Sequence, residues 1–277
     1  MMEKVIEVKE LTKNYGKHRG VEGVSFTVEK GDIFGFLGPN GAGKSTTIRS
    51  MLGLLQFESG EVCILGKDLK REKEAILQEV GYMPSEALFY PGMRVRDVIR
   101  LAADVRGRDC RMEAERLCER LQVAEDKRIR DLSLGNRKKV SIVCAMQHKP
   151  QLFIFDEPTS GLDPLMQLEF FKLIQEYVEG GATCLLSTHV LSEVKKYCRN
   201  VGIMKDGRLQ CVDTVEKFTK SNVKRVQLLR DGKREEFIFD GDLNMLADEL
   251  VGHNIEDILI EEPSLDEIFM HYYEKEK

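Results

Sequence analysis

The chain has 277 residues, of which 42% are hydrophobic and 32% charged, as in a globular protein of about two domains. Its formal net charge of −5 argues against a general nucleic-acid-binding protein, and no stretch approaches the ~18 consecutive apolar residues that cross a membrane. The N-terminus lacks an apolar signal segment and the seven cysteines form no CxxC pair, so we expect buried, reduced thiols rather than disulfides or a metal site.

The first part of the chain predicts strands that flank a glycine-rich loop. Residues 4–10 and 24–30 alternate apolar and polar side chains, which predicts two antiparallel strands. IFGFLG (33–38) is typical of a buried strand, and the run STTIRSMLGLL after the loop predicts a helix. EVCILG (61–66) predicts a further strand.

Apolar residues at helical spacing then dominate residues 92–148. They are Val95, Val98, Ile99, Ala102, Val105, Ala114, Leu117, Cys118 and Leu121. LFIFDE (152–157) returns to the pattern of a buried strand. We therefore expect a helical insertion, at about residues 85–150, between two strands of one sheet.

The remaining elements complete the sheet and add a second unit. We expect a helix over 165–178, a strand over 183–189, a helix near 190–198 and a hairpin that turns at Asp206-Gly207. From about residue 221 the pattern starts again, with two short strands, a helix, a strand and a last helix, SLDEIFMHYY. We expect an α/β domain over residues 1–217 and a small α+β appendage over residues 221–277.

The loop GPNGAGKST (38–46), here called the phosphate loop, matches G-x-x-x-x-G-K-S between a strand and a helix. Glycines let backbone N–H groups turn toward phosphate oxygens, and the helix N-terminus adds its positive end. Lys44 would neutralise the β- and γ-phosphates, and the hydroxyl of Ser45 would ligate Mg²⁺. The expected ATP contacts of this loop are Gly38, Pro39, Asn40, Gly41, Ala42, Gly43, Lys44, Ser45 and Thr46.

Two carboxylates follow the buried strand LFIFDE. Ligands of parallel sheets bind at the carboxyl ends of strands, so this end should face the phosphate loop. We expect Asp156 to hold Mg²⁺ through water and Glu157, which points elsewhere because side chains alternate along a strand, to polarise the attacking water. His189 ends the next apolar strand and is expected to contact the γ-phosphate.

These elements, in this order, resemble the nucleotide-binding subunits of ABC transporters. The resemblance rests on LSLGN (132–136), here called the signature segment, which heads the helix RKKVSIVCAM and takes the place of the family's LSGGQ. Ser133 and Gly135 match, whereas Leu134 and Asn136 depart from it. The resemblance implies a P-loop NTPase core with an antiparallel β subdomain. It also implies that Ser133 and Gly135 contact a γ-phosphate on an opposite subunit, so that two chains enclose two ATP molecules.

Further residues match the family. Tyr15 lies where the family stacks a ring on adenine, SGLD (160–163) resembles the segment that crosses the dimer interface, and STHVLSEV (187–194) resembles the family's histidine switch. The family's glutamine that touches Mg²⁺ is replaced by Ser85, which is too short for this reach. Metal contact through water and metal contact through the adjacent Glu86 both stay open.

The resemblance covers about residues 3–217, and the C-terminal EPSLDEIFMHYY is similar to the tail of drug- and antibiotic-exporter subunits. It implies an ATP- and Mg²⁺-dependent ATPase that energises a separate membrane permease for export of a small molecule, drug or peptide. The permease would dock near residues 84–100 and hold the chain at the inner face of the cell membrane. The partner ATPase would be a second copy or a different subunit, and no nucleic acid is expected.

Two alternatives to a transport subunit remain. ABC-type ATPases of DNA repair, chromosome organisation and translation usually add coiled coils, zinc modules or a second cassette, and none is visible in this sequence. An immunity or regulatory protein that uses ATP as a switch is the other alternative. The presence of Glu157 and His189 argues against it.

Overall fold

The computed structural model describes residues 3–16, 18–86, 88–219, 223–230, 232–252 and 254–261. The chain divides into two compact units, Met1–Val212 and Asp213–Lys277. The division falls inside strand β10 (Arg208–Thr214), the second strand of the hairpin expected around Asp206-Gly207.

The larger unit is built on a six-stranded sheet with the order β10-β9-β3-β8-β7-β6. Its other strands are β3 (Ile33–Leu37), β6 (Val80–Met83), β7 (Leu152–Asp156), β8 (Thr183–Thr188) and β9 (Asn200–Lys205). β3 pairs in parallel with β8 and β9, and β7 pairs in parallel with β8 and β6. β3, β7 and β8 are buried along their whole length, because helices and a second sheet cover the two faces. Their carboxyl ends therefore meet at one edge of the sheet.

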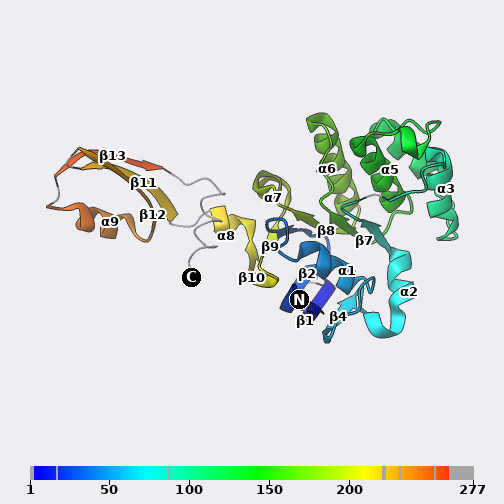
Figure 1. Cartoon of the computed structure of the whole chain (residues 1–277), viewed down its shortest axis with the longest axis horizontal. Coiled ribbons are helices and arrows are strands. Elements are labelled where there is room, and N and C mark those ends of the chain that lie inside the picture. Colours follow the sequence, from blue (N-terminus) through cyan, green and yellow to red (C-terminus); the bar gives the residue numbers. More distant parts are fainter. Residues whose placement is uncertain are drawn as a thin grey trace. The chain divides into compact units, whose positions relative to one another are not determined.

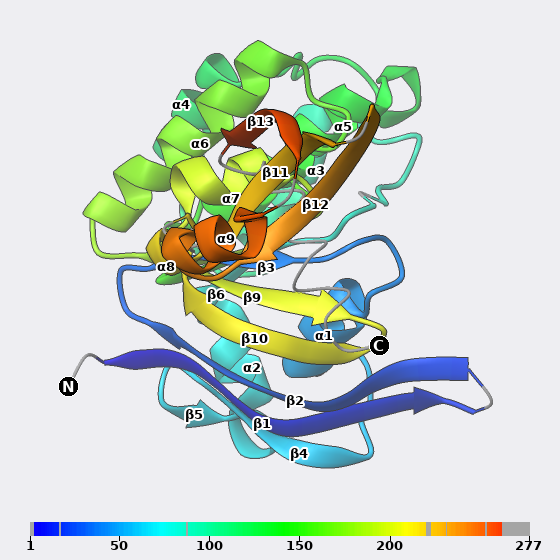
Figure 2. The same cartoon turned by 90° about the vertical axis from the view of Figure 1, so that its left-hand side faces the viewer.

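A four-stranded antiparallel sheet, ordered β2-β1-β4-β5, forms the second layer. Its strands are β1 (Lys4–Tyr15), β2 (His18–Glu29), β4 (Ser59–Ile64) and β5 (Lys67–Asp68). Helix α1 (Lys44–Met51) lies between the two sheets and contacts β1, β2 and β7 (Figure 2). The core there includes Ile6, Phe34, Phe36 and Ile48, all almost completely buried. The α1 helix that follows the phosphate loop is thus fixed on both sides.

The expected helical insertion is confirmed between β6 and β7 (Figure 1). It comprises α3 (Val95–Asp104), α4 (Arg111–Arg120), the 3₁₀ turn η1 (Ile129–Asp131) and α5 (Leu134–Met146). On the six-stranded sheet, α6 (Pro164–Glu179) packs on β8, and α7 (Leu191–Tyr197) packs on β3 and β8. Helix α2 (Leu69–Glu79) was not predicted: it buries only Leu69 and Ile76 and is interrupted by non-helical backbone at Glu72.

The smaller unit contains α8 (Val215–Thr219) and a three-stranded antiparallel sheet ordered β12-β11-β13. The strands are β11 (Val223–Arg230), β12 (Lys233–Asp240) and β13 (Ile255–Glu261). Helix α9 (Leu243–Leu250) packs Leu246 on Val226 and Leu228. The strands and this helix were predicted, whereas the predicted last helix, SLDEIFMHYY, lies outside the described residues.

Two expectations from composition can be compared with the described residues. None of the helices in the described part of the chain is both long enough and apolar enough to cross a bilayer. Cys110, Cys118, Cys184 and Cys198 are buried as expected, whereas Cys63, Cys144 and Cys211 are half-buried.

Candidate active site

The phosphate loop follows β3 directly and turns into α1 at Lys44. Gly41 has φ 83° and Gly43 has φ 103°. Residues other than glycine rarely adopt this left-handed backbone conformation. Gly43 also caps α1, so no side chain accepts hydrogen bonds from the first N–H groups of the helix. Pro39, Asn40 and Gly41 are exposed, and Ser45 and Thr46 are half-buried in the first helical turn. The loop therefore presents helix N–H groups and hydroxyls to a ligand.

Lys44 is only 5% exposed, and its charge is neutralised inside the protein. Nζ donates to the carbonyl oxygen of Gly38 at 2.6 Å and to that of Pro39 at 3.2 Å. It also lies 3.1 Å from Oε1 of Glu157. A buried ammonium group needs such partners, and the ion pair joins the phosphate loop to the end of β7.

Asp156 is the last residue of β7 and is completely buried. Its neighbour in the parallel register is Ser187 of β8, whose Oγ donates to Oδ1 of Asp156 at 2.6 Å. Oδ2 of Asp156 is buried and has no hydrogen-bond partner among the described residues. A buried carboxylate oxygen without a partner is costly, so this oxygen is a candidate contact for a cation or for water.

Glu157 follows the last residue of β7 and has a left-handed backbone, with φ 52°. Its N–H donates to the carbonyl oxygen of Ser187 at 3.1 Å and to Oγ of Ser187 at 3.2 Å. Its carbonyl oxygen accepts a hydrogen bond from Nζ of Lys138. We expected strand alternation to separate the directions of Asp156 and Glu157. In the structure Glu157 lies beyond the strand, and the left-handed turn sets its direction.

His189 follows β8 and reaches the same carboxylate as Lys44. Its Nδ1 lies 2.8 Å from Oε2 of Glu157, and its side chain is 48% exposed. The hydroxyl of Thr188 accepts from the N–H of Val190 and donates to Glu193, which holds the turn after β8. Lys44, Glu157 and His189 therefore form one connected group at the carboxyl edge of the sheet.

The signature segment forms the start of α5. Ser133 caps this helix, and its Oγ accepts from the N–H of Asn136 at 3.3 Å. A Cβ on Gly135 would lie 2.5 Å from the carbonyl oxygen of Gly161, so only glycine fits there without a shift. Leu134 is 54% exposed. No hydrogen bond or ion pair within the described ranges joins Ser133 to the phosphate loop.

Two other residues singled out in the sequence lie at the ends of strands. Tyr15 ends β1 and is 44% exposed, with Nζ of Lys13 at 5.4 Å from the centre of its ring. Ser85 lies just beyond β6 and is half-buried, next to the exposed Glu86. Metal contact of Ser85 through water and metal contact by Glu86 both stay predictions.

Two residues that contact the site were not predicted from the sequence. Ser187 is a polar residue inside the apolar strand TCLLST. Its hydroxyl donates to the carboxylate of Asp156 and accepts from the N–H of Glu157. Lys138 is a lysine on the buried side of α5. For Ser187 the available signal was a polar side chain within an apolar run, since such groups need partners. Lys138 stands between Arg137 and Lys139, so no apolar run marks it as buried.

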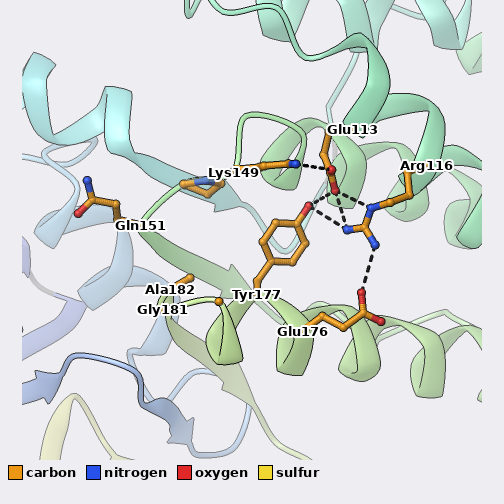
Figure 3. Close-up of a pocket in the computed structure, with 10 residues that line it drawn as sticks. Glu113, Arg116, Lys149, Gln151, Glu176, Tyr177, Gly181 and Ala182 are labelled. Atoms are coloured by element: carbon orange, nitrogen blue, oxygen red, sulfur yellow. Dashed lines mark hydrogen bonds and ion pairs between the residues drawn. The ribbon is translucent and has the colours of Figure 1, made fainter.

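A separate pocket lies at the opposite edge of the sheet, where β7 and β8 begin (Figure 3). Glu113 of α4 is its centre: it accepts from Arg116 and from the hydroxyl of Tyr177, and it pairs with Lys149 at 2.9 Å. Arg116 also pairs with Glu176. These bonds tie the insertion to α6 and take no part in the group around Glu157.

Comparison with known proteins identifies the family to which this chain belongs. The family model described as "ABC transporter" matches residues 21–160. The chain belongs to the ABC transporter family. It is 36% identical to the bacitracin transport ATP-binding protein BcrA of Bacillus licheniformis, over 75% of this chain and 69% of that protein.

Two further matches agree with this assignment. The chain is 39% identical to the probable multidrug ABC transporter ATP-binding protein YbhF of Escherichia coli, over 75% of this chain. The match spans 36% of YbhF, so the chain corresponds to about a third of that longer protein. A solved structure of an ATP-binding subunit of an ABC transporter has a TM-score of 0.75 and 29% identity, and the match covers 98% of this chain and 100% of that one. The expected fold is confirmed by this likeness.

Proposed function

We propose that this chain hydrolyses ATP and thereby energises a separate membrane permease that exports a small molecule, drug or peptide. The observation that carries the proposal is the contact of one carboxylate, Glu157, with both Lys44 and His189. It brings a phosphate-binding lysine, a candidate general base and a histidine together where a parallel sheet binds its ligands.

The phosphate loop is proposed to bind ATP through the N–H groups at the start of α1 and through Lys44. The partners of Lys44 are two backbone carbonyl oxygens and one carboxylate, and phosphate oxygens are acceptors of the same kind. When Lys44 turns to the β- and γ-phosphates, Glu157 loses its ion pair. The carboxylate is then available to accept a proton.

Glu157 is proposed to orient water and accept its proton, while His189 supports the γ-phosphate. The residues present also fit Mg²⁺, because Oδ2 of Asp156 is buried without a partner within the described residues and Ser45 offers a hydroxyl. Mg²⁺ usually takes one or two protein ligands beside phosphate oxygens and water. When bound, it would stabilise the negative charge of the phosphates during transfer.

ATP binding is proposed to close two ATPase subunits on each other. Ser133 and Gly135 would face the γ-phosphate on the other subunit, because they offer a hydroxyl and a helix N-terminus at the surface. The exposed ring of Tyr15 would stack on adenine. The other subunit is a second copy of this chain or a different ATPase subunit, and product release would reopen the pair.

A groove on the insertion supports the docking of a permease. It has a volume of about 650 Å³ and lies between α2, α3 and the segment around residues 84–93. Leu88, Tyr90 and Val105 line it and are more than 70% exposed. Exposed apolar side chains around one hollow are typical of an interaction site. We propose that an apolar segment of the permease fills it at the inner face of the cell membrane.

The kind of cargo is inferred from relatives. BcrA is named for bacitracin transport and YbhF as a probable multidrug ABC transporter protein. We propose a drug- or antibiotic-like cargo for this chain as well, with export as the direction of transport.

The proposed activity is tested by steady-state ATP hydrolysis of the purified chain with Mg²⁺ and with excess EDTA. We expect turnover with Mg²⁺ and a loss to background with EDTA, restored when Mg²⁺ is added back. Absence of hydrolysis under both conditions, in protein that binds ATP, would contradict an ATPase and favour an ATP-binding switch.

A further inference from the structure

Lys138 is a buried cation on the helix headed by the signature segment. It is 2% exposed, and its Nζ donates to the carbonyl oxygen of Glu157. Burial lowers the pKa of Lys138, whereas the charges of Glu157, Asp156 and Glu193 raise it. A lysine is rarely buried to this degree without a specific partner. The backbone of Glu157 is that partner.

The hydrogen bond from Lys138 completes the restraint of a strained residue. The N–H of Glu157 is bonded to Ser187 of β8, and its carbonyl oxygen is bonded to Lys138 of α5. Between these bonds the backbone has φ 52°, a conformation that a glutamate keeps only where its surroundings enforce it. The side chain that leaves this backbone reaches Lys44 and His189. The direction of the carboxylate therefore depends on bonds from two different elements.

We propose that Lys138 is a positioning residue for hydrolysis: it holds the carbonyl group of Glu157 so that the carboxylate faces the phosphate loop. The inference rests on the proposed role of Glu157. Because Ser133 caps the helix that carries Lys138, a shift of α5 on subunit closure would also reach the backbone of Glu157. The rate at this chain's own ATP site would thus depend on the position of its signature helix.

The neighbouring Lys139 provides a matched control. It lies on the same helix and is 8% exposed, but no hydrogen bond or ion pair among the described residues joins it to Glu157. Lys138→Met removes the donor while it keeps most of the apolar stem. Lys138→Arg keeps a cationic donor, and Lys139→Met removes a charge from the same helix.

The test measures ATP affinity at equilibrium and the single-turnover rate of hydrolysis for the wild type and these variants. We expect Lys138→Met to lower the rate about ten- to hundredfold, since small misplacements of a reacting group have effects of this size. ATP affinity should stay within about twofold, because phosphate binding belongs to the loop and α1. Lys138→Arg should recover most of the rate, and Lys139→Met should keep it. If Lys138→Met does not fold, Lys138→Gln replaces it, because its shorter side chain stays polar but falls short of the carbonyl oxygen.

A wild-type rate in the Lys138 variant, or an equal loss in Lys139→Met, would overturn the inference and leave the proposed ATPase intact. A wild-type protein that binds ATP without hydrolysis would instead contradict the proposed function itself. The two failures are therefore distinguishable in one set of measurements.

Discussion

Lys44 and Glu157 are oppositely charged side chains that are largely removed from solvent, with 5% and 14% of their side chains exposed. Their contact at 3.1 Å offsets part of the cost of burying each charge, together with the bonds to Gly38, Pro39 and His189. A phosphate group would compete for the same ammonium. The ion pair thus joins a candidate phosphate-binding group to a candidate base, and we expect a bound phosphate group to separate them.

At the residue scale, Lys44→Ala should weaken ATP binding about ten- to hundredfold. A hydrogen bond to a charged group contributes about 1.5–3 kcal/mol, and the variant removes such bonds from the phosphates. Equilibrium titration with ATP measures the change, and Lys30→Ala is the control because Lys30 pairs with Glu3 at the surface, away from the loop. Unchanged ATP affinity in Lys44→Ala would contradict the assignment of the phosphate loop.

At the scale of elements, the start of α5 and the segment 160–163 are packed too closely to accept a side chain. Gly135→Ala would place a Cβ 2.5 Å from the carbonyl oxygen of Gly161, and overpacking of this kind typically costs about 1–3 kcal/mol. We expect this change to weaken ATP-dependent pairing of subunits about tenfold when it is added to Glu157→Gln.

Light scattering with and without ATP measures this pairing. Gly92→Ala is a matched control, because a Cβ there would meet open space. Equal pairing in the Gly135 and Gly92 variants would show that the close contact has no part in closure. A Glu157→Gln parent that stays monomeric at saturating ATP would contradict closure of two copies of this chain in isolation.

Elements with a strong apolar pattern, continuous or periodic, could be predicted from the sequence, whereas weakly patterned elements could not. The buried strands ending at Leu37, Asp156 and Thr188 are nearly continuous apolar runs, so their ends and the side chains after them could be placed in one sheet. Helix α2 buries only two residues and is interrupted at Glu72, so its pattern is faint.

The same limit applies to the candidate site. Lys44, Glu157 and His189 were found because each follows a recognisable strand, whereas the partner of Lys138 is a backbone carbonyl in another element. Periodicity predicts that a residue is buried but not which atom it bonds. The left-handed turn at Glu157 is likewise set by bonds from β8 and α5, which no local pattern contains.

At the scale of the whole molecule, the parallel sheet joins residues that are far apart in the chain. Lys44 comes after β3, His189 after β8 and Glu157 after β7. These strands are neighbours in the order β3-β8-β7, so the three side chains lie in contact in one site. Each of the two units has a core of its own. The chemistry proposed for the chain belongs to the larger unit.

The most direct measurement compares ATP turnover and ATP affinity in wild type and Glu157→Gln. The amide keeps the shape of the side chain but cannot accept the proton of the attacking water, and a general base typically contributes about 10²–10⁴-fold to the rate. We predict a loss of turnover of at least about 100-fold, with ATP affinity within about threefold of the wild type. Wild-type turnover in Glu157→Gln would contradict the proposed role of Glu157, because the residue in contact with both Lys44 and His189 would then not be the base.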